Sequence, residues 1–127
     1  MTTDATEVIA GYFEALTAGD TGRILNLFAA GAHVYSPFLG VMPATEFYVK
    51  LDAASAQSVL TVLDVLMGQD GQTAAARFQY DWTLRSGDKI LFEGVDHFTF
   101  DAARRIVDMR IYYDTHPVRA DVGDKYG

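Results

Sequence analysis

The sequence predicts an α+β fold, with three helices in its first half and a curved antiparallel sheet in its second. Two observations lead to this prediction. Apolar residues recur at helical spacing before residue 55, whereas four later segments are rich in β-branched and aromatic residues and are separated by short turns. A chain of 127 residues also suits one hydrophobic core. We therefore expect a single domain over 1–127, with the helices packed on one face of the sheet.

Three segments have the spacing of amphipathic helices: 6–18, 21–30 and 44–55. Gly19 suits the C-terminal cap of the first helix, and Asp20 suits the N-cap of the second. Residues 33–36 have the character of a short strand that Pro37 ends, and the letters FLGVMP that follow it are typical of a loop. The first half is therefore expected to be mainly helical.

Four strands are expected at 59–67, 73–84, 90–100 and 106–113, with hairpin turns at GQDGQ, RSGDK and DAARR. Because side chains alternate along a strand, one parity of each should face the helices. In the second strand that set is Phe78, Tyr80, Trp82 and Leu84, and in the fourth it is Val107, Met109, Ile111 and Tyr113. Aromatic side chains should therefore line the inner face.

The third strand carries a carboxyl group in this aromatic setting. In FEGVDHFTF the inward parity is Phe92, Gly94, Asp96, Phe98 and Phe100. Burying an ionised carboxylate without a partner is very costly, so a buried Asp96 would stay protonated and act as a hydrogen-bond donor. A register shifted by one residue would instead expose Asp96 and bury the residue after it. Alternation alone leaves both registers open.

Charge and composition exclude several classes of function. The net charge of −7 disfavours nucleic acid and anionic membranes as partners, and we expect no membrane span. The absence of cysteine excludes disulfides and thiolate catalysis, and it fits a cytoplasmic protein, as does an N-terminus without the pattern of a secretory signal. The three histidines are scattered, and no glycine-rich loop follows a strand. We therefore expect neither a metal nor another cofactor.

Several short segments resemble a known family when taken in order. GYFEALTAGD with its Tyr12, then VYSP, EFY, DHFTF and RIVDMR are arranged as in the bacterial ketosteroid isomerases. That family belongs to the superfamily of nuclear transport factor 2 (NTF2) and the SnoaL-type polyketide cyclases. The resemblance covers about residues 8–113. It implies an NTF2-like cone, in which the curved sheet encloses an apolar pocket for a small hydrophobic ligand, and a homodimer formed through the outer sheet face.

The resemblance also implies roles for individual residues. Tyr12 corresponds to the oxyanion-hole tyrosine and Asp96 to the protonated aspartic acid, while Tyr48 would support Tyr12 through a hydrogen bond and Met109 would form part of the pocket wall. Two neutral donors aimed at one oxygen stabilise the charge that develops there. The expected pocket residues are Tyr48, Phe38, Phe78, Tyr80, Trp82, Phe92, Phe98, Met109 and Tyr113.

Ser36 occupies the position at which the family has its general base, an aspartate. An alcohol is a very weak base at neutral pH unless a histidine takes its proton, and His33, three residues away on a strand, faces the opposite side. Losing a general base typically lowers a rate by about 10²–10⁴-fold. Asp52 and Asp114 are alternative carboxylates, although each is more typical of a solvated residue.

Three functions remain open. The first is an isomerase or cyclase that acts on a hydrophobic ketone, such as a steroid or polyketide, with Tyr12, Asp96 and a relocated base in place of Ser36. The second is a non-catalytic protein that binds such a ligand. The third is a protein-interaction module whose cavity is filled by its own aromatic side chains.

Overall fold

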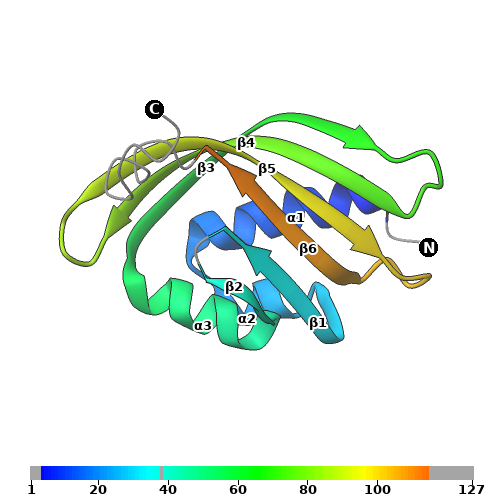
Figure 1. Cartoon of the computed structure of the whole chain (residues 1–127), viewed down its shortest axis with the longest axis horizontal. Helices are drawn as coiled ribbons and strands as arrows, with labels where there is room; N and C mark the ends of the chain where they lie inside the picture. Colours follow the sequence, from blue (N-terminus) through cyan, green and yellow to red (C-terminus); the bar gives the residue numbers. More distant parts are fainter. Residues whose placement is uncertain (1–3, 38, 115–127) are drawn as a thin grey trace, which may run out of the picture.

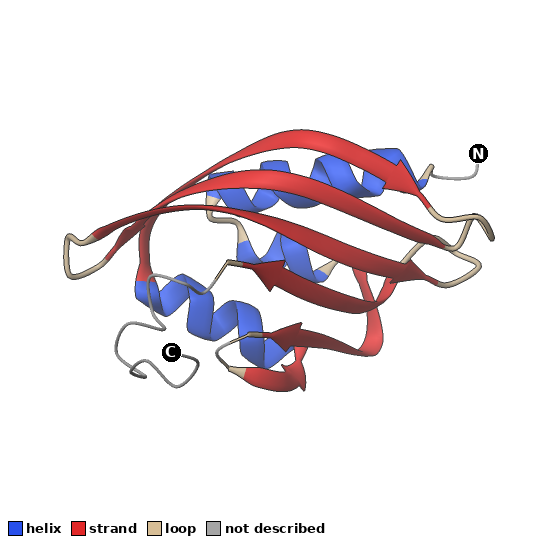
Figure 2. Cartoon of the chain, turned by 45° about the horizontal axis from the view of Figure 1, so that its top comes forward, coloured by secondary structure: helices blue, strands red, loops and turns tan. Residues whose placement is uncertain are grey.

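The computed structural model describes residues 4–37 and 39–114. The elements are α1 (Ala5–Ala18), α2 (Thr21–Leu25), β1 (Phe28–Ser36), β2 (Gly40–Pro43), α3 (Ala44–Ala54), β3 (Ser55–Met67), β4 (Thr73–Leu84), β5 (Lys89–Phe100) and β6 (Ile106–Tyr113). The strands of this part of the chain form one sheet in the order β2-β1-β6-β5-β4-β3. The sheet curves strongly, and the helices lie on its concave side (Figures 1 and 2). The predicted α+β fold class is confirmed.

The helix caps follow the sequence signals. Gly19 adopts a left-handed conformation with φ 70°, and its N–H donates to the carbonyl oxygen of Leu16, which ends α1. The Asp20 carboxylate accepts a hydrogen bond from the N–H of Arg23 at 3.1 Å and caps α2. The apolar stripe of α1 is buried against the sheet, and Tyr12 is part of it. Local chemistry therefore places α1 and the start of α2 as predicted.

The segment after Leu25 differs from the prediction. We expected α2 to continue to residue 30, but β1 begins at Phe28. The reason is a long-range partner, because Phe28 pairs with Ile106 of β6, whose N–H donates to the carbonyl oxygen of Leu27 at 2.9 Å. Pairing with β6 thus provides the backbone hydrogen bonds that a longer helix would have supplied.

The sheet contains two further departures from the prediction. Part of the expected FLGVMP loop is the edge strand β2, whose residues 40–43 pair antiparallel with β1. Pro43 is tolerated there because an edge strand needs fewer backbone donors. In addition, β1 and β6 run parallel, so the sheet is mixed rather than wholly antiparallel. The meander from β3 to β6 is antiparallel, as expected.

The register of β5 decides which way Asp96 faces. Asp96 pairs with Ala76 of β4 and Ile111 of β6 and is 3% exposed. The shifted register, with His97 inside, is therefore excluded. In β6 the buried Met109 follows the prediction, but Val107 is only half-buried and Ile106 takes the fully buried place, because the pairing with β5 is irregular there.

The concave side of the sheet is packed with aromatic rings. Tyr12 makes edge contacts with Phe28, Tyr48 and Phe98, with ring centroids 5.6–6.3 Å apart. Farther along the sheet, the Phe92 ring stacks on Tyr80 at 5.2 Å. Rings at these distances leave little room between them. In the described part of the chain, no helix is long and apolar enough to span a membrane.

Candidate functional site: two tyrosines and a buried aspartic acid

Tyr12 and Tyr48 form a buried hydroxyl pair. Tyr12 comes from α1 and Tyr48 from α3, and their hydroxyl oxygens lie 2.7 Å apart. The Tyr48 hydroxyl also donates to the Met109 sulfur at 3.6 Å. Burial raises the pKa of both phenols well above the ordinary value, so both remain protonated at neutral pH. The expected contact of Tyr12 with Tyr48 is therefore present.

Asp96 is a buried carboxyl group, and no ion pair joins it to another of the described residues. Burial raises its pKa well above the ordinary value, which favours the neutral acid. Its Oδ1 atom has no hydrogen-bond partner in the described part of the chain. Burial is the main cause that raises the pKa of Tyr12, followed by the Tyr48 phenol and then by the charge of Asp96. Tyr12 and Asp96 therefore lie within electrostatic reach of each other. The site therefore holds an unsatisfied polar atom within electrostatic reach of a phenol.

A second set of hydroxyl groups lies at the start of β3. The Ser58 and Tyr80 hydroxyl oxygens are 2.7 Å apart, and Trp82 Nε1 donates to Ser55 Oγ at 2.8 Å. Burial raises the pKa of Tyr80 to about 12. The sequence reasoning missed Ser55 and Ser58 because it began this strand at residue 59. A usable signal was that a buried Tyr and Trp each need a hydrogen-bond partner.

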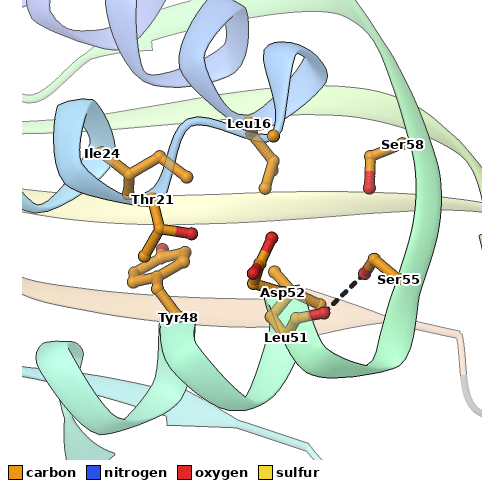
Figure 3. A pocket seen from close by; sticks show the side chains of 9 residues that line it. Leu16, Thr21, Ile24, Tyr48, Leu51, Asp52, Ser55 and Ser58 are labelled. Carbon is orange, nitrogen blue, oxygen red and sulfur yellow. Dashed lines mark hydrogen bonds between the residues drawn. The ribbon is translucent and has the colours of Figure 1, made fainter.

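A small surface cavity lies next to these groups. Its volume is about 30 Å³, and it is lined by Leu16, Gly19, Thr21, Ile24, Tyr48, Leu51, Asp52, Ser55 and Ser58. Figure 3 shows the oxygens of Thr21, Asp52 and Ser58 directed toward it. Asp52, which the sequence suggested as an alternative base, is exposed to solvent and lines the edge of this cavity. Typical ligand pockets enclose roughly 300–1,000 Å³, so this cavity holds only one group of a ligand.

The expected pocket residues mostly pack against one another. Phe78, Tyr80, Phe98 and Met109 are buried, whereas Trp82, Phe92 and Tyr113 are half-buried; Phe38 lies outside the described residues. Of the nine, Tyr48 lines the small cavity and Tyr113 lines an open groove of about 300 Å³ near the end of β6. A large guest on the concave side would therefore have to displace aromatic rings.

Ser36 occupies the turn between β1 and β2. Its Oγ accepts a hydrogen bond from the N–H of Leu39 at 3.3 Å, and its backbone pairs with Gly40. Serine commonly stabilises turns in this way. His33 is exposed farther back on β1. Ser36 therefore has a structural role in the β1–β2 hairpin. A role of Ser36 in proton transfer stays a prediction.

Known proteins resemble this chain over most of its length. The SnoaL-like domain family matches residues 9–109. A steroid Δ-isomerase of Nocardioides simplex is 27% identical over 119 residues, which cover 89% of this chain and 92% of that protein.

Two solved structures share the fold. The epoxide hydrolase/cyclase-like enzyme SalBIII, with a role in pyran ring formation in the polyether salinomycin, superposes with a TM-score of 0.78 at 21% identity, covering 88% of this chain and 92% of that one. An NTF2-like protein of Burkholderia pseudomallei gives a TM-score of 0.75 at 16% identity, covering 96% and 99%. The chain therefore belongs to the SnoaL-like domain family and has the cone-shaped α+β fold of NTF2-like, ketosteroid isomerase-like proteins.

Proposed function

We propose that this protein binds a hydrophobic ketone, or the corresponding enol or phenol, and that Tyr12 and Asp96 donate hydrogen bonds to its oxygen. The observation that carries the proposal is the buried Asp96, whose Oδ1 lacks a partner among the described residues and whose pKa is raised by burial. A neutral carboxylic acid has an O–H group that can donate a hydrogen bond to a ligand oxygen. A steroid-like or polyketide-like oxygen is a suitable acceptor.

The hydroxyl pair can accommodate such a ligand at little cost. Because the Tyr48 proton is directed at the Met109 sulfur, a weak acceptor, Tyr48 can turn it toward the Tyr12 oxygen instead. Tyr12 is then free to donate to the ligand. Two preorganised donors in a dry interior stabilise an enolate oxygen more than a neutral carbonyl, which is the requirement for isomerase or cyclase chemistry.

A non-catalytic binding protein is a second candidate. It is favoured by Ser36, whose hydroxyl is engaged in the turn and which lacks the basicity of a carboxylate. An interaction module is a third candidate, favoured by the ring-packed interior and by exposed apolar side chains such as Leu91 on the outer sheet face. We further propose a homodimer through that outer face, a hydrophobic pocket that opens with the ligand, and a cytoplasmic location.

Phenol binding tests the proposed oxygen site. We expect β-naphthol to bind as its naphtholate anion, with a shift in its absorption spectrum. Tyr12→Phe and Asp96→Leu should each weaken binding by roughly 10–100-fold, since a hydrogen bond to a charged group contributes about 1.5–3 kcal/mol. Asp96→Asn is the matched control, because its amide still donates, and it should lose less affinity. Equal affinity in all four proteins would contradict the proposal.

Restoring a carboxylate at residue 36 tests the catalytic reading. With a β,γ-unsaturated ketone as substrate, Ser36→Asp should raise kcat/KM by about tenfold or more, because a general base contributes about 10²–10⁴. Aspartate can also accept the Leu39 N–H, so the turn should persist. Ser36→Asn is the uncharged control. If the Asp and Asn variants turn over the ketone at the same rate, Ser36 does not occupy a base position.

A further inference from the structure

The small cavity is bounded by three parts of the fold. Leu16 and Thr21 come from the α1–α2 corner, Asp52 from the end of α3, and Ser58 from β3 (Figure 3). Its volume of about 30 Å³ has room for one or two water molecules, or for the hydroxyl end of a ligand. The cavity therefore has the size of a subsite rather than of a complete ligand pocket.

One hydrogen bond connects this cavity with Tyr12, and an electrostatic effect relates it to Asp96 through Tyr80. Tyr48 lines the cavity, and its hydroxyl lies 2.7 Å from that of Tyr12. Ser58 also lines it and is bonded to Tyr80, whose pKa is raised first by burial and also by the charge of Asp96. Tyr12 is thus one side chain away from the cavity. A ligand whose oxygen lies at Tyr12 would extend toward it.

The polar groups of the cavity favour a hydrogen-bond donor. The Asp52 carboxylate can only accept hydrogen bonds when ionised. Ser55 donates its proton to the carbonyl oxygen of Leu51 at 2.6 Å and accepts from Trp82 Nε1, so it has no proton to offer a ligand. Of the described residues that line the cavity, none is a Lys, Arg or His. Acceptors therefore outnumber donors there.

Asp52 is held in place by the end of its helix. The guanidinium of Arg85 donates to the backbone carbonyl oxygens of Asp52 at 3.2 Å and Ala53 at 2.8 Å. These bonds satisfy carbonyl groups that α3 leaves open at its C-terminus. The backbone beneath the Asp52 carboxylate is therefore fixed, which lowers the cost of binding a ligand group there.

We propose that this cavity is a binding subsite for a hydroxyl group of the ligand, with the Asp52 carboxylate as its acceptor. The inference rests on the proposed function and narrows its ligand class. The ligand is a hydroxylated ketone or a diphenol, with one oxygen between Tyr12 and Asp96 and a second, proton-bearing oxygen at Asp52. A hydrophobic ketone without that hydroxyl group binds more weakly.

The test compares ligands that differ only in the donor. Resorcinol and 2,7-dihydroxynaphthalene, two diphenols of different span, are each titrated against their monomethyl ethers, which have lost one donor. With the wild type, at least one diphenol should bind about tenfold tighter than its ether, as one hydrogen bond to a charged acceptor allows. Asp52→Ala should abolish that preference, and Asp52→Asn, which keeps an oxygen acceptor, should retain part of it.

The controls separate this inference from the function on which it depends. Asp81→Ala removes the same charge from the exposed outer face and should leave the preference unchanged. Urea unfolding of Asp52→Ala shows whether the variant is folded. Suppose that β-naphthol binds, but the wild type binds the diphenols no tighter than their ethers, or Asp52→Ala keeps the preference for the diphenols. Either result refutes the subsite and leaves the proposed function standing. If no phenol binds to the wild type, the proposed function and the subsite are both refuted.

Discussion

Asp96 lowers the stability of the fold, whereas the proposed function requires it. A buried carboxyl group with an unpartnered oxygen costs free energy, because in the unfolded chain water would satisfy it. Packing does not require a carboxyl group at this position, because the same face of β5 also carries the buried apolar side chains of Phe98 and Phe100. A costly polar group in an aromatic interior is typical of a functional site.

The raised pKa of Asp96 has a measurable consequence for stability. The folded protein keeps this proton above the pH at which the unfolded chain, with an aspartate pKa of about 3.9, releases it. The free energy of unfolding should therefore fall with rising pH, by up to about 1.4 kcal/mol per unit, until the pH passes the folded-state pKa. Asp96→Asn cannot titrate and should lack this slope.

Urea unfolding of both proteins at several pH values between about 4.5 and 8 checks this expectation, with the difference between them as the quantity compared. The other titrating groups are common to both proteins and cancel in that difference. A difference that stays constant over the whole range would mean that Asp96 has an ordinary pKa in the folded protein.

At the scale of the elements, β5 holds Asp96 in place through close contact with both neighbouring strands. Gly94 lies two residues before it on the same face, and a Cβ atom added there would be 2.9 Å from the Phe78 ring and 2.9 Å from the carbonyl oxygen of Tyr112. The backbone atom cannot move aside cheaply. Glycine therefore allows β4, β5 and β6 to pack closely beside the site.

Gly94→Ala should consequently lower the free energy of unfolding by about 1–3 kcal/mol, the usual cost of overpacking. Gly11→Ala is the matched control, because nothing lies within 4 Å of its added Cβ and it is in the middle of α1. It should stabilise the protein by about 0.5–1 kcal/mol through helix propensity. Chemical denaturation measures both. Equal effects of the two substitutions would contradict the close packing at Gly94.

At the scale of the molecule, the sheet has two unlike faces. Its concave face is covered by helices and aromatic rings, whereas its outer face exposes apolar side chains that include Leu66, Leu91 and Tyr112, each more than half exposed. Exposed apolar groups gathered on one face are typical of an interaction surface. A second copy of the chain is the partner that we propose for it.

Sedimentation equilibrium tests the proposed dimer. Leu91→Arg should weaken association by at least about tenfold, because a buried leucine contributes roughly 1.5–3 kcal/mol and an unpaired charge adds a further cost. Val49→Arg introduces the same charge at an exposed apolar position of α3, away from the sheet, and should leave association unchanged. A wild type that remains monomeric at high concentration would contradict the proposal.

Features that depend on local spacing could be predicted from the amino-acid sequence alone. Period-two alternation limited β5 to two registers, one of which buries Asp96, and the apolar stripe of α1 identified Tyr12 as buried. The cap residues Gly19 and Asp20 separated the first two helices. Such features follow from residues that are near one another in the chain, so one sequence suffices to predict them.

Contacts between residues far apart in the chain depend on the folded arrangement. The pairing of Phe28 with Ile106 ended α2 early, and the contact between the Tyr12 and Tyr48 hydroxyls joins residues 36 positions apart. The cavity at Asp52 and Ser58 exists because α3, β3 and the α1–α2 corner meet there. Local spacing carries no information on which distant backbone or side chain completes a hydrogen bond. The resemblance to a known family indicated the Tyr12–Tyr48 contact, whereas the pairing of Phe28 and the cavity at Asp52 follow only from the folded chain.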